Sequence, residues 1–216
     1  MGIWLATLAV LGIALNIALT WPGVWRVLRY GPVGVSVGTV LAGFTARTLW
    51  SAYAVHAHDL ALFIGQAPVA AGFAAIAVVT ARRRGARTAT WLGCGLAVAL
   101  ALAAGLAAWA PAVLTTLAIG VAAIVNVPQM LRVFFDAHAA AGVSAAMYWF
   151  TAAASATWLS YGIVVNDLAI SAPHFFLLPT AIITAIAVQR RHRGRLTASV
   201  SFRRRQPTPT QGSARP

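Results

Sequence analysis

A few polar and aromatic side chains lie within otherwise apolar stretches, and their types suit the binding of a polar solute. Trp50 and Trp158 are each followed three residues later by a tyrosine, Tyr53 and Tyr161, on the same helical face. Such an aromatic stripe suits stacking on a sugar ring. Arg47 precedes Trp50 by three residues, and its guanidinium matches a carboxylate or a phosphate. The alternative for Arg47 is a side chain that points into a wet cavity or binds backbone carbonyls.

These aromatic residues belong to an internal repeat. Residues 34–36, Trp50, Tyr53 and the Asp59-Leu60 pair recur 108 residues later as residues 142–144, Trp158, Tyr161 and the Asp167-Leu168 pair. Upstream, Pro22 and Arg26 recur 106 residues later as Pro128 and Arg132. The chain has only three acidic residues, four Tyr and eight Trp, so chance matching is a poor explanation. Duplicated helical membrane proteins are commonly transporters.

Composition places the chain in a lipid bilayer. It is 60% hydrophobic and only 9% charged, which excludes a soluble domain of this length. A helix of about 20 apolar residues crosses the hydrocarbon core, and segments of that length recur along the chain. We therefore predict seven spans, at residues 3–28, 35–56, 59–81, 89–110, 112–134, 143–164 and 168–189.

The arginines predict the orientation of the spans. The net charge of +13 comes from arginine alone, and the basic clusters near 26–29, 82–87, 132 and 190–195 all fall on one side of the seven-span arrangement. Basic loops face the cytoplasm, so we predict a plasma-membrane protein with its N-terminus outside. The arginines mark helix ends and form no extended basic face, which argues against nucleic acid as a partner. Anionic lipid is the expected partner of the basic tail, and the tail is predicted to be disordered.

Seven spans accommodate two parallel units of three helices. A second three-helix unit joined directly to the first would be inverted, and one added crossing restores the parallel relation. The prediction is an all-α polytopic protein with a first repeat at residues 1–87, a linker helix at 88–111, a second repeat at 112–189 and a basic tail at 190–216. A pseudo-twofold axis then runs along the membrane normal.

The second repeat resembles the PQ-loop and SWEET (MtN3/saliva) transporter family. The resemblance rests on NVPQMLRVF at 126–134, GVS at 142–144, WLSYG at 158–162 and the Asp167-Leu168 pair. It implies that Trp50 and Trp158 line a central pocket. It also implies a hinge at Pro22, Pro128 and Gln129, where a proline weakens its helix. Its implied outer gate consists of Tyr53, Asp59, Tyr161 and Asp167.

Two positions depart from that family. Sixteen residues after each tryptophan, where the family has asparagine, this chain has Gln66 and His174. A polar side chain inside a membrane helix is costly and is a functional candidate by default. The alternative is a structural bond to a neighbouring helix. His174 can titrate near neutral pH, which asparagine cannot.

These observations favour a transporter that moves a small polar solute by alternating access, with a sugar as the first choice and uniport in either direction. The alternative is an amino acid or organic acid, with proton coupling through His174. A non-transporting receptor is the third class, and an oligomer of identical chains is compatible with the sequence. We expect no enzymatic activity, cofactor or metal site. The sequence shows neither a nucleophile paired with a base nor a phosphate-binding loop. Cys94 is a lone cysteine, and His56, His58 and Asp59 are predicted to lie in a solvated loop.

Overall fold

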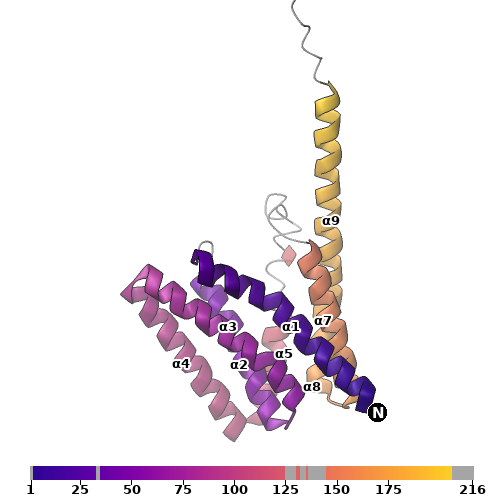
Figure 1. The fold of residues 1–216 in the computed structure, drawn as a ribbon. Coiled ribbons are helices and arrows are strands. Elements are labelled where there is room, and N and C mark those ends of the chain that lie inside the picture. The colour runs from indigo at the N-terminus through magenta and orange to yellow at the C-terminus, as the bar shows by residue number, and fades with distance from the viewer. Residues whose placement is uncertain (1, 33–34, 125–129, 132–134, 136–144, 206–216) are drawn as a thin grey trace, which may run out of the picture.

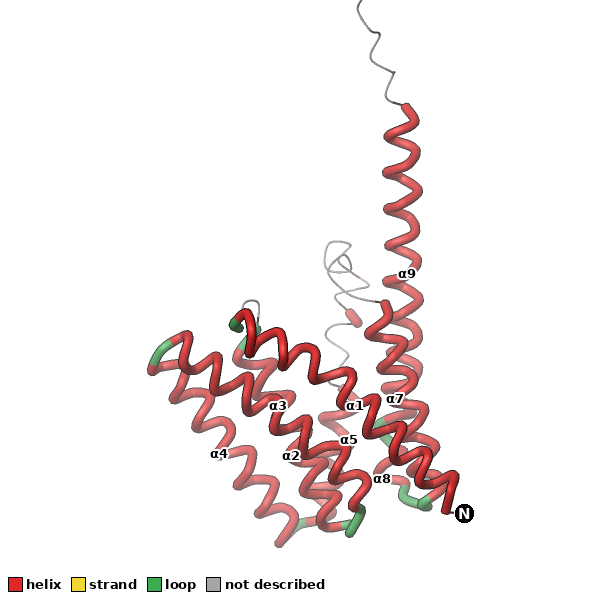
Figure 2. Tube along the Cα trace, in the orientation of Figure 1, coloured by secondary structure: helices red, strands yellow, loops and turns green. Residues whose placement is uncertain are grey.

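The computed structural model describes residues 2–32, 35–124, 130–131, 135 and 145–205 (Figure 1). Within these ranges the chain is helical and contains no strand. Short loops connect most of the helices (Figure 2). The helices are α1 (Gly2–Tyr30), α2 (Val37–His56), α3 (Leu60–Arg84), α4 (Ala86–Trp109), α5 (Pro111–Ile124), α7 (Ala145–Val164), α8 (Leu168–Ser171) and α9 (His174–Arg205).

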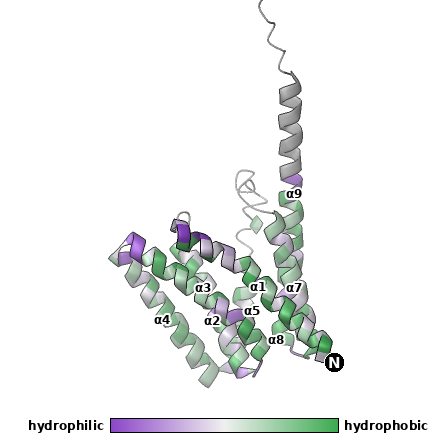
Figure 3. Ribbon diagram, viewed as in Figure 1, coloured by the Kyte–Doolittle hydropathy of each residue, from purple (hydrophilic) through white to green (hydrophobic). Residues whose placement is uncertain are grey.

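Four stretches of helix are long and apolar enough to cross a membrane, and they are α1, α3, α4 and residues 168–191. Apolar residues cover most of their length in Figure 3. α2 and α7 have 20 residues each but include more polar residues, among them Arg47 and Ser155. α5 is a shorter apolar helix over its described part. The chain is therefore an all-helical protein with several helices suited to a bilayer.

The helices pack crosswise. α3 lies between α1 and α2, and α9 packs against α7. Across the molecule α1 packs against α7, and α5 packs against α2. The first helix of each predicted repeat thus contacts the second helix of the other repeat. α4 packs on α2 and α3, along the side of the bundle away from α7 and α9 (Figure 1).

Two turns at one end of the bundle have the same backbone geometry 108 residues apart. The amide of Asp59 donates to the carbonyl of Ala54 at 2.9 Å, and the amide of Asp167 donates to the carbonyl of Gly162 at 2.8 Å. The residues before these aspartates, His58 and Asn166, have φ angles of 54° and 58°. A left-handed residue after a helix allows the chain to reverse at once. Both turns therefore deliver their aspartate to the start of the next helix.

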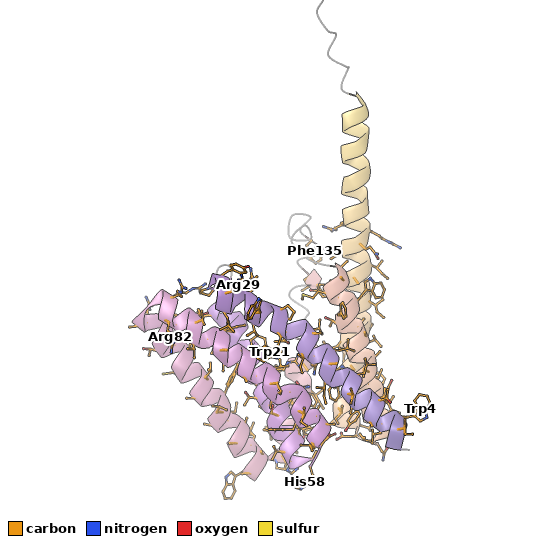
Figure 4. The ribbon with its side chains drawn as sticks, viewed as in Figure 1. Trp4, Trp21, Arg29, His58, Arg82 and Phe135 are labelled. Carbon is orange, nitrogen blue, oxygen red and sulfur yellow. The ribbon has the colours of Figure 1, made fainter. Side chains whose placement is uncertain are left out.

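The arginines and these turns lie at opposite ends of the bundle. Figure 4 labels Arg29 and Arg82 at one end and His58 at the other. At the arginine end, Nη2 of Arg84 donates to the carbonyls of Pro32 and Val35 at 3.0 and 2.6 Å. The end that contains His58 is the outer end, named for its predicted orientation, and the other is the arginine end.

The last helix is longer than the sequence predicts. The sequence predicts a span that ends at residue 189 and a disordered tail from residue 190, but α9 continues to Arg205. Between Pro179 and Pro207 the chain has no proline, so no residue that must interrupt a helix falls before Arg205. At its other end α9 is separated from α8 at Pro173, which lacks the amide hydrogen needed to continue the helix.

Candidate functional site

The two predicted aromatic stripes have the same geometry. The rings of Trp50 and Tyr53 meet edge to face with centroids 5.5 Å apart and an interplanar angle of 80°. The rings of Trp158 and Tyr161 do the same at 5.4 Å and 77°. Edge-to-face contact places the positive edge of one ring on the negative face of the other. All four rings belong to one buried core cluster near the outer end.

Trp158 fills a slot made by two glycines of the other repeat. A Cβ atom added at Gly12 of α1 or at Gly65 of α3 would lie 2.8 Å from the Trp158 ring. The indole is only 2% exposed, and its buried Nε1 has no hydrogen-bond partner. Trp50 is 6% exposed. The faces predicted to stack on a solute are therefore covered in this conformation, and a solute reaches them only if the helices separate.

The four residues predicted as an outer gate are in contact, and they pair across the two repeats. The hydroxyl of Tyr53 donates to Oδ2 of Asp167 at 2.7 Å. The hydroxyl of Tyr161 lies 3.0 and 2.9 Å from the two carboxylate oxygens of Asp59. Each tyrosine ends the second helix of one repeat, and each aspartate begins the third helix of the other. The outer end is thus held by two reciprocal hydrogen bonds to charged acceptors.

The same aspartates also cap helices. Oδ1 of Asp59 accepts from the amide of Leu62 at 2.8 Å, and Oδ1 of Asp167 accepts from the amide of Ala169 at 2.9 Å. A carboxylate at the first turn satisfies amides that have no partner within the helix. The capping bonds hold the carboxylates in place, so the tyrosine hydroxyls meet preorganised acceptors.

Arg47 and Gln66 form a polar pair in the interior of the first repeat. Nη1 of Arg47, near the middle of α2, donates to Oε1 of Gln66 on α3 at 2.7 Å. Gln66 is buried and Arg47 is half-buried. His174, at the start of α9 in the other repeat, is half-buried, and its buried Nδ1 has no hydrogen-bond partner. The structure therefore brings Arg47 and Gln66 into contact, and it shows no hydrogen bond from His174 to either of them.

Asn16 is a polar residue of this region that the sequence analysis missed. It is 4% exposed on α1, one helical turn from Gly12, and its Nδ2 donates to the carbonyl of Gly65 at 3.2 Å. An amide inside an apolar helix was the available signal. Its repeat counterpart is Ala122, so the repeat does not mark this position.

Only part of the predicted hinge is described. Pro22 lies inside α1, where a proline removes one helical hydrogen bond. Its counterpart Pro128 and the adjacent Gln129 lie outside the described residues. Two further prolines, Pro68 in α3 and Pro179 in α9, also lie within helices.

Comparison with known proteins does not assign the chain to a family. No protein-family model matches the chain, and no curated protein matches it.

Proposed function

We propose that this chain is a transporter that moves a small polar solute across the plasma membrane by alternating access, without a chemical step. The observation that carries the proposal is the reciprocal pairing of Tyr53 with Asp167 and of Tyr161 with Asp59. These bonds join the two repeats at the outer end, next to a buried cluster in which Nε1 of Trp158 has no hydrogen-bond partner. A closure that bridges two units and can be broken at modest cost is what alternating access needs.

The packing of the helices supports an arrangement of seven spans. The crosswise contacts of α1 with α7 and of α5 with α2 have the form expected for two parallel repeats related by a twofold axis. In this proposal α2, α5 and α7 also cross the bilayer, and α4 links the repeats. The end with Arg29 and Arg82 faces the cytoplasm, because basic residues are retained on that side.

A sugar is the first candidate solute. Trp50 and Trp158 are matched in the two repeats, share one core cluster and lie beside the gating tyrosines. When the outer end opens, their faces offer two stacking surfaces for a ring. The two described aspartates are engaged at the outer turns and are not available to bind a coupling ion. The proposed mode is therefore facilitated diffusion in both directions.

An organic acid or amino acid is the second candidate, and one observation favours it. Arg47 is half-buried and bonded to Gln66, and no carboxylate of the described residues pairs with it. A cation inside a membrane protein without an internal counter-ion suits a negatively charged group on the solute.

Counterflow in proteoliposomes tests the proposed transport. Vesicles loaded with unlabelled solute should accumulate labelled solute only when they contain the protein, across a panel of sugars, amino acids and organic acids. Trp158→Ala should reduce this counterflow by about two- to twelvefold, since a lost stacking contact is worth about 0.5 to 1.5 kcal/mol. Trp109→Ala is the matched control, because Trp109 is 89% exposed at the end of α4. Counterflow by no member of the panel, or equal loss in both variants, would refute the proposal.

A further inference from the structure

The polar residues Arg47, Gln66 and His174 restrict the identity of the solute more than Trp50 and Trp158 do. Trp50 and Trp158 are almost fully covered by protein, whereas Arg47 and His174 retain partial exposure in the same conformation. These two polar side chains are therefore less completely covered than the two tryptophans in this conformation. Their chemistry is specific enough to name the group that they bind.

The charge of Arg47 is not neutralised within the described chain. Asp59 and Asp167 are the acidic residues of the described ranges, and both are engaged at the outer turns by a tyrosine hydroxyl and by helix amides. Gln66 is a neutral acceptor that holds one nitrogen of the guanidinium. An uncompensated cation in a low-dielectric interior attracts an anion strongly.

The geometry around Arg47 suits a carboxylate. One guanidinium nitrogen is fixed by Gln66 at 2.7 Å, which orients the planar group and leaves its other donors free of partners among the described residues. A carboxylate accepts two parallel hydrogen bonds from such a planar fork. His174 Nδ1 is a buried polar atom without a partner, and it comes from the opposite repeat. A solute that bridges Arg47 and His174 therefore contacts both halves of the protein.

We infer that Arg47, oriented by Gln66, binds a carboxylate group of the transported solute. The inference rests on the proposed transport function and, within it, selects solutes with one carboxylate over the neutral sugar named first. A single arginine without a second described cation beside it favours one negative charge over two. The polar remainder of the solute then lies between the two repeats, toward Trp50 and Trp158.

The test uses purified full-length protein and two readouts, equilibrium binding and counterflow. Binding is measured as thermal stabilisation by formate, acetate and gluconate, each compared with sodium chloride and inorganic phosphate at equal ionic strength. Formate and acetate report a carboxylate subsite whatever the rest of the solute is. Glucose is the neutral counterpart of gluconate, and counterflow of the two is compared in proteoliposomes.

We expect carboxylates to stabilise the protein more than chloride or phosphate does, and gluconate to be carried faster than glucose. Arg47→Gln should weaken carboxylate binding by about tenfold or more, as expected on losing a hydrogen bond between charged groups. Arg82→Gln removes the same charge from the exposed arginine end and should leave binding unchanged.

Gln66→Glu is the sharper variant. It replaces the neutral acceptor, 2.7 Å from Arg47, with a carboxylate of the same shape. The internal ion pair should preserve folding and compete with the solute, so carboxylate binding should fall by about tenfold or more while Arg47 remains in place. If Gln66→Glu binds carboxylates as the wild type does, the inference is wrong.

The remaining outcomes separate the inference from the proposed function. Equal stabilisation by chloride or phosphate, or no stabilisation by any carboxylate, would overturn the carboxylate site. Glucose counterflow that survives in both variants, together with absent carboxylate counterflow, would overturn it as well and leave transport intact. Carboxylate binding that depends on Arg47 without counterflow of any solute would support the site and refute transport.

Discussion

In the proposed transport cycle the hydroxyls of Tyr53 and Tyr161 hold the outer end closed, so their removal predicts faster opening. Tyr53→Phe and Tyr161→Phe each delete one hydrogen bond to a carboxylate and keep the ring that packs on the neighbouring tryptophan. Hydrogen bonds to charged groups contribute about 1.5 to 3 kcal/mol. The aspartates are half-buried, so we take the lower value, about 1.5 kcal/mol for each bond.

The magnitude follows from the population of the open state. Each lost bond of about 1.5 kcal/mol raises the ratio of open to closed protein by about tenfold, and the double variant raises it by about a hundredfold. When the closed state dominates, a reagent that attacks only open protein reacts at a rate proportional to the open fraction.

Cysteine labelling measures this fraction. Ser155 is 3% exposed on α7 one turn before Trp158, so a Ser155→Cys thiol is protected while the outer end is closed. With Cys94 replaced by alanine, this thiol is the single target for a membrane-impermeant reagent added outside. Labelling should accelerate about tenfold in each tyrosine variant and more in the double variant.

Tyr148→Phe is the matched control, since Tyr148 is a buried tyrosine of α7 in a separate cluster with Ala181 and Ala185. It should label at the rate of the parent protein. A double variant that also labels at the parent rate would refute the gating role of the hydrogen bonds, provided that both proteins remain folded by size-exclusion chromatography.

Two further predictions concern topology and packing. A single cysteine at His56 should react with an impermeant reagent added outside intact cells, and one at Arg87 only after permeabilisation; the same sidedness for both would exclude the proposed orientation. Gly12→Ala should lower the melting temperature or shift the protein toward the open state, because its Cβ would lie 2.8 Å from Trp158 and overpacking costs about 1 to 3 kcal/mol. Gly120→Ala, where no atom lies within 4 Å, should be neutral or stabilising, and an equal effect of both alanines would argue against the slot.

The internal repeat alone marks much of the candidate site in the sequence. Tyr53, Asp59, Tyr161 and Asp167 recur 108 residues apart among rare residue types, and the structure brings all four together. Gln66 and His174 were found at matched positions in the same way. Asn16 was missed because α5 has alanine at the corresponding position, so no repeat marked it.

The local sequence also predicted the helices and the end of the bundle at which the arginines lie. The length of apolar runs and the glycine, proline and arginine breaks place most helix boundaries within a few residues of those observed. These properties depend on neighbours along the chain, since helix propensity and hydrophobicity act over one or a few turns. The predicted span 168–189 is divided into α8 and α9, and the predicted end of the span 112–134 lies outside the described residues. A further difference is the end of α9, where the polar residues 190–205 predict disorder and the helix continues through them.

The partners across the repeats were decided by tertiary packing. No pattern in the sequence states that Tyr53 pairs with the aspartate of the other repeat, 114 residues away. Nor does it state that Gly12 and Gly65 enclose Trp158, which covers the surfaces expected to be open to a solute. Such contacts depend on the distances and angles between helices, which are set by close packing of side chains from distant segments. The sequence alone therefore determined which residues are candidates, and the fold determined which of them meet.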